Sequence, residues 1–369
     1  MKGSNRVLNF DPGCKTTAMG IMPHKDIARA IELALSLDIP YWPQLPNVSF
    51  YEDMYAQTSE GFPGVTIDVQ GQRVLFDSAR FDRDLATYSE KMADTDYYSL
   101  SEAYSSVYHR FLGLDLRGHA AVRGQVTGPV SFGFRVVDQT QRPIIYDESI
   151  RTMLFDFIQR KLNAQYCQLR EKNENAFVWA DEPGLGWVFS GLSGYDDVQA
   201  RRDYRSFLNG VEGMKALHLC ANVNLPYLLE LGVDMVSFDA YQIGVMPKAY
   251  AEPVASFLKR DGVIAWGLVP TDSTSLDKET AESLTTLLTG YWAVLSRESG
   301  ISVEQIARQS LIAPARCCLK NIGAVGAAGE PARATSAACP VASTEEGLVE
   351  RAFAVLRELS LTLKDKFGL

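Results

Sequence analysis

The chain has 369 residues, with 45 acidic and 36 basic side chains and a formal net charge of −9. This balance argues against a nucleic-acid-binding protein, which needs clustered Lys and Arg to contact phosphates. Hydrophobic residues make up 46% of the chain, enough to bury a large core, so intrinsic disorder is excluded. Neither a signal-peptide core at the N-terminus nor an apolar run of membrane-spanning length is found, so we expect a soluble cytoplasmic protein with no membrane partner.

Short apolar or β-branched runs alternate with helical patterns along the chain. Eight repeats of this kind favour the α/β class and a single (β/α)8 TIM barrel, forming one domain over residues 1–369, with a doubly wound open sheet as the alternative. The helical periodicity predicts helices over 25–37, 147–172, 222–232 and 277–297. The predicted strands are 16–21, 41–46, 120–127, 176–181, 214–219, 234–239, 262–268 and 309–314.

Three further segments carry local signals. Residues 64–77 are predicted to form a β-hairpin that lies outside the barrel, over one mouth of the barrel. Residues 321–345 are rich in Ala, Gly, Ser, Thr and Pro, which predicts a flexible surface loop; a mobile flap beside the site is the alternative. A last helix follows, and Ser343 with Glu346 fits a capping box at its start.

Metal-binding residue types gather at the carboxyl ends of the predicted strands, where barrel enzymes place their chemistry. His218 and Cys220 are two residues apart and share one face of an extended segment, Asp239 ends the next strand, and Cys317 follows the last. Imidazole, two thiolates and a carboxylate form a coherent zinc set with a net charge of about −1, which favours a zinc that activates a thiol. The alternative is a hydrogen-bonded core histidine beside small buried cysteines.

Five segments resemble a known family in the same order along the chain. They are 16–24 (TTAMGIMPH), 124–132 (GQVTGPVSF), 179–186 (WADEPGLG), 218–220 (HLC) with 237–241 (SFDAY), and 315–320 (ARCCLK). Together they resemble the catalytic C-terminal half of cobalamin-independent methionine synthase, in the uroporphyrinogen decarboxylase and methionine synthase-like superfamily. The resemblance implies one zinc per chain and methyl transfer to a small thiol, homocysteine above all.

The same resemblance assigns the metal ligands. His218, Cys220 and Cys317 correspond to the family's zinc ligands, and the family's glutamate ligand falls on Asp239. Cys317 is preferred over Cys318, because it aligns with the family's cysteine when Leu319 is matched.

The substrate site is assigned in the same way. Asp181 corresponds to the acid that holds the amino group of homocysteine, and Glu52 is taken as the second such acid. Met19, Gly20 and Ile21 correspond to the segment that holds the substrate carboxylate, with Ile21 in place of the family's serine. Two further residues are assigned from their place in the chain. His24 is a catalytic proton shuttle or contacts the methyl donor, with the ordering of its loop as the alternative, and Tyr241 lines the pocket.

The length bears on the methyl donor. Full-length family members resemble two barrels and use the second to bind folate, whereas this chain has room for one barrel. It resembles a short core form, for which a methylated corrinoid protein or methylcobalamin is the expected donor. The alternatives are a corrinoid:coenzyme M methyltransferase, a uroporphyrinogen decarboxylase-like protein, and a non-catalytic relative that docks a corrinoid protein.

Overall fold

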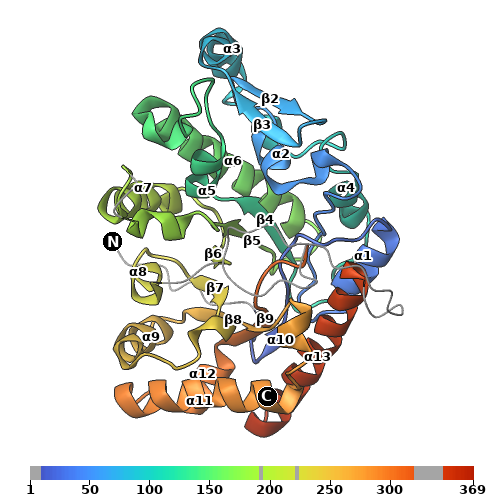
Figure 1. The fold of residues 1–369 in the computed structure, drawn as a ribbon, viewed down its shortest axis with the longest axis vertical. Coiled ribbons are helices and arrows are strands. Elements are labelled where there is room, and N and C mark those ends of the chain that lie inside the picture. Colours follow the sequence, from blue (N-terminus) through green and yellow to red (C-terminus); the bar gives the residue numbers. More distant parts are fainter. Residues whose placement is uncertain (1–9, 191–193, 221–223, 320–343) are drawn as a thin grey trace.

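The computed structural model describes residues 10–190, 194–220, 224–319 and 344–369. Seven parallel strands form one curled sheet in the order β1-β9-β8-β7-β6-β5-β4, with helices around its outer face (Figure 1). The α/β class is therefore confirmed. The strands are β1 Lys15–Thr16, β4 Arg123–Thr127, β5 Phe177–Asp181, β6 Lys215–Leu219, β7 Met235–Asp239, β8 Val263–Val269 and β9 Ser310–Pro314.

The sheet is a TIM-like half-barrel, and the prediction of eight strands is wrong for the described residues. Residues 41–46 form no strand but make single bridges, Tyr41 to Arg123 of β4 and Gln44 to Ile21 beyond β1. Prolines 40, 43 and 46 explain this, because a proline has no N–H to donate to a ladder. The segment still spans the gap between β1 and β4, since Arg123 N donates to Pro40 O (2.9 Å) and Gln44 N to Gly20 O (2.7 Å).

Helices follow the strands, and the predicted ones are present: three lie within their predicted limits, and the fourth begins four residues later and ends two residues later than predicted. Asp26 and Asp147 cap α1 and α6 by accepting hydrogen bonds from the first backbone N–H groups. The α-helices are α1 Ile27–Leu35, α2 Met54–Ser59, α3 Ser78–Lys91, α4 Ser106–Leu112, α5 Pro129–Arg135, α6 Glu148–Arg170, α7 Asp197–Asn209, α8 Leu225–Leu229, α9 Ala251–Leu258, α10 Ser273–Leu276, α11 Ala281–Ser299, α12 Val303–Arg308 and α13 Glu345–Phe367. Short 3-10 helices are η1 Phe50–Glu52, η2 Thr95–Tyr98, η3 Ile144–Tyr146, η4 Leu185–Phe189, η5 Tyr241–Ile243 and η6 Lys248–Tyr250. None of the described helices has the length and apolar character needed to cross a membrane.

Two apolar cores lie on the two faces of the sheet, because successive residues of a strand point to opposite sides. The outer and larger core packs strand residues such as Val178, Leu217 and Val236 against the helices. The inner core is small and includes Phe177, Trp179 and Met235. The inward positions nearest the carboxyl ends of the strands are polar instead, and this polar layer forms the site described below.

The predicted hairpin is confirmed as β2 Val65–Asp68 paired antiparallel with β3 Arg73–Phe76. It forms a separate two-stranded sheet and, with α3, projects at one end of the molecule (Figure 1). Strand β3 contacts α2. Helix α2 in turn lies at the carboxyl end of β4, where Thr127 Oγ1 donates to Met54 O (3.0 Å). The hairpin therefore lies on the side of the sheet that carries the site.

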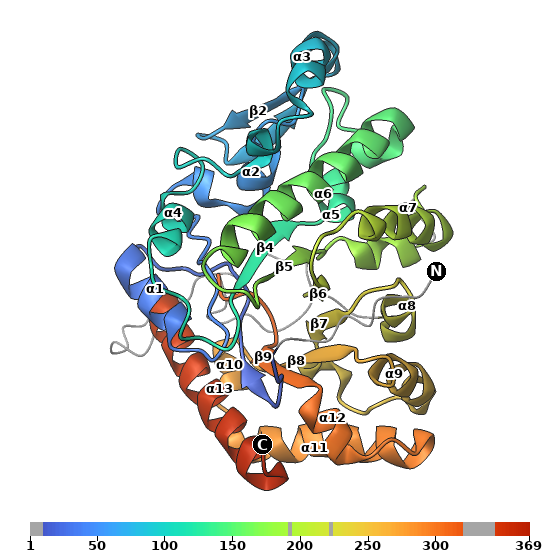
Figure 2. The ribbon, with the colours of Figure 1, turned by 180° about the vertical axis from the view of Figure 1, so that it is seen from behind.

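The last helix, α13, lies beside α1 in both views of the molecule (Figures 1 and 2). Its N-cap is Thr344, whose hydroxyl accepts from Gly347 N (3.0 Å). The helix therefore begins one residue later than the predicted capping box, and Glu346 accepts from Lys25 N (3.1 Å). Ser343 and most of the predicted loop 321–345 lie outside the described residues.

Thr344→Ala should lower the free energy of unfolding by about 1 kcal/mol, because it removes the acceptor for an N–H at the start of α13. Thr344→Ser keeps the hydroxyl and is the matched control, expected to remain close to the parent. Urea denaturation of the three proteins measures both values. Equal losses in the two variants would contradict the capping role.

Candidate functional site

Four polar side chains form a row across neighbouring strands at the carboxyl end of the sheet. In the strand register, Thr127 of β4 pairs with Asp181 of β5, Asp181 with His218 of β6, and His218 with Ser237 of β7. All four are buried. Parallel strands in register place these side chains on one face at one level, so the sheet itself assembles the row.

His218 lies at the centre of this row and contacts groups on three sides. Its Nδ1 lies 2.9 Å from Ser237 Oγ, and its Nε2 lies 2.6 Å from Cys220 Sγ. The ring stacks on Trp179, with centroids 5.5 Å apart. Burial, with a smaller contribution from the charge of Arg123, lowers the pKa of His218 to about 3, so the imidazole is neutral at physiological pH.

Cys220 and Cys317 come from opposite parts of the sheet and meet at the site. Their side chains are hydrogen-bonded to each other, and both cysteines are free of disulfide bonds. This hydrogen bond is the main reason that the pKa of Cys317 is lowered and that of Cys220 raised. The two thiols therefore lose their first proton at a lower pH than an ordinary cysteine and their second proton at a higher pH. Cys318 is buried; its Sγ donates to Arg316 O (4.0 Å), and its backbone N donates to Ile21 O (3.4 Å).

Asp239 is held by an arginine that the sequence analysis did not single out. Arg316 Nε donates to Asp239 Oδ2 at 2.7 Å, and Gln242 N donates to Asp239 Oδ1 at 3.2 Å. The Asp239 side chain is 1% exposed, so this ion pair is shielded from water on the carboxylate side. Its carboxylate is thus engaged by Arg316, the residue next to Cys317.

Asp181 is buried and incompletely partnered. Its Oδ1 has no hydrogen-bond partner among the described residues. Burial raises the pKa of Asp181 to about 7, against the lowering effect of Arg123, while the negative charges of Cys317 and Glu182 add to the rise. An unpartnered buried carboxylate oxygen is costly, and a cationic ligand would compensate that cost.

Arg123 lies beneath this row in the inner core and is fully buried. Its guanidinium is 4.2 Å from the centre of the Trp179 ring and 5.0 Å from that of Tyr41. Nη2 donates to Ala18 O, and Nη1 donates to Gly124 O at 3.1 Å. Arg123 therefore supplies positive charge under Asp181 and His218 without forming a direct ion pair with Asp181.

Glu182, next to Asp181, has a structural role at the start of α5. Its carboxylate accepts hydrogen bonds from Val130 N (3.0 Å), Ser131 N (2.7 Å) and Tyr204 OH (2.8 Å). A negative charge at a helix N-terminus is favourable. A side chain at Gly128 would meet Glu182 Oε1 at 2.2 Å, which is why the Thr-Gly-Pro segment carries glycine there.

The segment assigned to the substrate carboxylate packs closely on two glutamines. Met19 and Gly20 are buried and Ile21 is half-buried. A Cβ at Gly20 would lie 2.6 Å from the Gln125 side chain and 2.9 Å from Gln44 Oε1, so only glycine allows this approach. The contact of Cys318 N with Ile21 O brings the segment beside Cys317.

Glu52 is buried, and donors of the protein engage both of its carboxylate oxygens. Oε2 accepts from Ser105 Oγ (2.6 Å) and Gln57 Nε2 (3.0 Å), while Oε1 accepts from Val107 N (3.2 Å). Gln57 in turn accepts from Gln44 Nε2 (2.8 Å). The structure therefore connects Glu52 to the Gly20 segment through Gln57 and Gln44.

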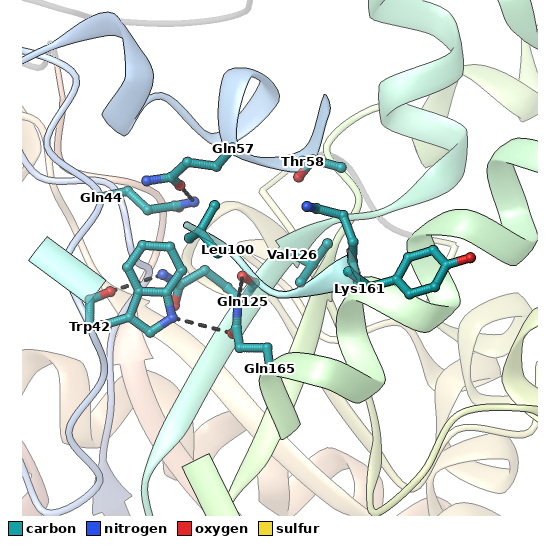
Figure 3. A pocket seen from close by; sticks show the side chains of 10 residues that line it. Trp42, Gln44, Gln57, Thr58, Leu100, Gln125, Val126, Lys161 and Gln165 are labelled. Atoms are coloured by element: carbon teal, nitrogen blue, oxygen red, sulfur yellow. Dashed lines mark hydrogen bonds between the residues drawn. The ribbon is translucent and has the colours of Figure 1, made fainter. Parts of the chain in front are cut away.

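A small cavity lies among these glutamines (Figure 3). Its volume is about 20 Å³, room for one water molecule. Gln44 Oε1 and Gln125 Oε1 have no hydrogen-bond partner among the described residues. Lys161 also lines the cavity, and its Nζ donates to Glu60 O at 3.0 Å. Burial lowers the pKa of Lys161 from 10.5 to about 8.

The depressed pKa of Lys161 predicts a change of stability with pH. Between pH 8 and about 10.5 the unfolded chain holds more protons than the folded one, so stability should rise with pH by about 3 kcal/mol relative to Lys161→Met. Lys259→Met, which removes an exposed lysine, is the control and should keep the parent's pH dependence. Urea denaturation across this pH range measures the difference. Parallel curves for the parent and Lys161→Met would contradict the prediction.

The two remaining predicted residues lie apart from the His218 cluster in their contacts. His24 is fully buried, and neither ring nitrogen has a hydrogen-bond partner among the described residues. Burial lowers its pKa. Tyr241 is half-buried, and its hydroxyl donates to Glu279 Oε1 at 2.9 Å.

The predicted metal ligands are only partly brought together. Pairwise contacts join His218, Cys220 and Cys317, whereas Asp239 forms an ion pair with Arg316. In the ranges that the structure describes, no group of three or more His, Cys, Asp or Glu side chains has the arrangement of a metal centre.

Three residues of the site, Arg123, Ser237 and Arg316, were not predicted from the sequence. Of these, only Ser237 had a usable signal, because it lies two residues before Asp239 and therefore on the same face of its strand.

No model of a known protein family matches the chain, and no curated protein sequence matches it. Among solved structures, it is similar to a B12-independent methionine synthase from a Shewanella species in complex with selenomethionine, with 14% identity and a TM-score of 0.41. The match covers 68% of this chain and 64% of that protein, so it spans less than two thirds of the methionine synthase. A likeness this weak does not define the reaction of this chain.

Proposed function

We propose that this chain is a methyltransferase that transfers a methyl group to the thiol of a small amino acid such as homocysteine. The observation that carries the proposal is the contact of His218, Cys220 and Cys317 at the carboxyl end of the sheet, beside the unpartnered Asp181 Oδ1. The order of the motifs that resemble cobalamin-independent methionine synthase supports the same reaction. The proposed donor is a methylated corrinoid protein or methylcobalamin.

The types of donor atom in the cluster suit zinc with three protein ligands, and these side chains would have to move to take the arrangement of a metal centre. One imidazole nitrogen and two thiol sulfurs are a set that zinc prefers, and catalytic zinc sites keep a fourth position open for substrate. Ser237 holds Nδ1 of His218 and so directs Nε2 toward Cys220, as an outer-shell partner does. Asp239 would complete the set only after release from Arg316. Zinc bound here would lower the pKa of the acceptor thiol, so that it reacts as a thiolate.

The protein's own groups would bind and orient the acceptor. Asp181 Oδ1 would accept a hydrogen bond from the substrate's ammonium group, and this positive charge would return the pKa of Asp181 toward its ordinary range. Arg123 beneath it favours the ionised carboxylate. The backbone of Met19, Gly20 and Ile21 would receive the substrate carboxylate, with Gln44 and Gln125 fixing the position of Gly20.

Metal analysis of the purified full-length chain tests the zinc site. We expect about one zinc per chain, lost in Cys220→Ser and in Cys317→Ser, because each removes one of three ligands. Cys167→Ser is the matched control, since this exposed cysteine lies outside the cluster and should leave the zinc content unchanged. Parent protein prepared with zinc present and still free of metal would refute the zinc mechanism.

Asp181→Asn tests the binding of the ammonium group in steady-state assays with methylcobalamin as donor. We expect the KM for homocysteine to rise about tenfold or more, because a charge-assisted hydrogen bond is lost. The KM for coenzyme M, a thiol without an amino group, should change little. An equal rise for both thiols would contradict the proposed role of Asp181, and activity with coenzyme M alone would change the assigned acceptor.

A further inference from the structure

A second pocket lies between the hairpin β2–β3, the start of α2 and the end of α5. Its cavity volume is about 360 Å³, within the range of small-molecule sites. It is much larger than the cavity in Figure 3 and shares no lining residue with it. The lining residues are Phe50, Asp53, Tyr55, Gln72, Arg73, Val74, Leu75, Arg135, Val137 and Gln141.

The lining combines an apolar wall with an available cation. Phe50, Tyr55 and Leu75 supply aromatic and aliphatic surface. Arg135 forms no ion pair or hydrogen bond within the part of the chain described, whereas Arg73 is paired with Asp68 at 3.0 Å. Asp53, which also lines the pocket, uses its Oδ1 to cap α2. Of the two lining guanidinium groups, that of Arg135 is thus the one without an ion pair or side-chain hydrogen bond among the described residues, and it interacts with Asp53 only through charge.

Two strained turns present side chains to the same pocket. Among the described non-glycine residues only four have a positive φ, and two of them, Gln72 (φ 49°) and Gln141 (φ 65°), line this cavity. Glycine or asparagine is the usual residue in this conformation, so a glutamine here carries a cost in backbone strain. Strain of this kind gathers at ligand sites, where the side chain is needed.

We propose that this pocket binds a small carboxylic acid with an apolar body. The carboxylate would pair with Arg135, whose planar guanidinium matches carboxylate geometry, and the apolar body would pack on Tyr55 and Leu75. The amides of Gln72 and Gln141 would complete the hydrogen bonds. The proposal does not depend on zinc or on methyl transfer.

The pocket adjoins the site through Tyr55. This residue lines the pocket, and the charges of Glu182 and Asp181 act on its hydroxyl. Its ring also lies 6.4 Å from that of Phe132 in α5. Tyr55 therefore connects the pocket to α5, the helix whose start is bound by Glu182.

Calorimetric titration of the full-length chain at low salt tests the charge requirement, with 3-phenylpropanoate and its neutral analogue 3-phenylpropanamide as probes. We expect the carboxylate to bind about tenfold more tightly than the amide, and Arg135→Gln to abolish this preference. Arg117→Gln is the matched control, because it removes the same charge at a remote exposed site, and should retain the preference. Equal binding of the two probes, no saturable binding at millimolar concentration, or an unchanged preference in Arg135→Gln would overturn the proposal.

The double variant Gln72→Gly with Gln141→Gly tests the strained turns and guards against misfolding. Glycine relieves the backbone strain, so the melting temperature should stay the same or rise. Affinity for 3-phenylpropanoate should nevertheless fall several-fold, because both amides are lost. Unchanged affinity in this variant would show that the glutamines serve no ligand and would contradict the site as proposed.

Discussion

The register of the parallel strands is the constraint on which the site depends. Hydrogen bonding between neighbours fixes Asp181 beside His218 and His218 beside Ser237, and no loop is needed to assemble them. The inward positions below, such as Trp179 and Met235, are apolar and pack into the inner core. Apart from Arg123 and Gln125 below it, the inward polar side chains of the row lie at the carboxyl ends, where a ligand can reach them without crossing that core.

Several charged side chains are buried around this polar layer, and different kinds of contact stabilise them. Glu182 receives N–H groups at the start of α5, and Arg123 is covered by the faces of Trp179 and Tyr41. Asp239 is paired with Arg316. Asp181 Oδ1 has no hydrogen-bond partner among the described residues, and neither has the buried Nε of Arg123. Because burying an unsatisfied carboxylate is costly, this oxygen is the place where a bound cation would gain most.

The segment between β1 and β4 shows how local chemistry shapes the site. Its prolines prevent a full ladder, so residues 41–46 hold the sheet through single bridges and side-chain hydrogen bonds. Gln44 takes part in both, because its backbone bonds to Gly20 and its side chain to Gln57. The network that ends at Glu52 thus sets the path of the Gly20 segment. The strand predicted over 41–46 is replaced by a polar support for the mouth of the sheet.

The sequence by itself determined the elements whose signals are local. The apolar runs of β4 to β9 lie close to their predicted limits, and the aspartates before α1 and α6 cap those helices because a cap needs only neighbouring N–H groups. The shared face of His218 and Cys220 likewise follows from the two-residue period of a strand.

Only the tertiary structure decided how distant charges pair. Arg316 and Asp239 are 77 positions apart, and nothing in either segment indicates that one neutralises the other. The same holds for Glu52, whose donors come from residues more than 50 positions further along the chain as well as from the nearby Gln57. Such contacts depend on which side chains the folded sheet and its helices bring within a few ångströms. Sequence patterns encode direction and burial along an element, whereas they do not encode the distance between elements.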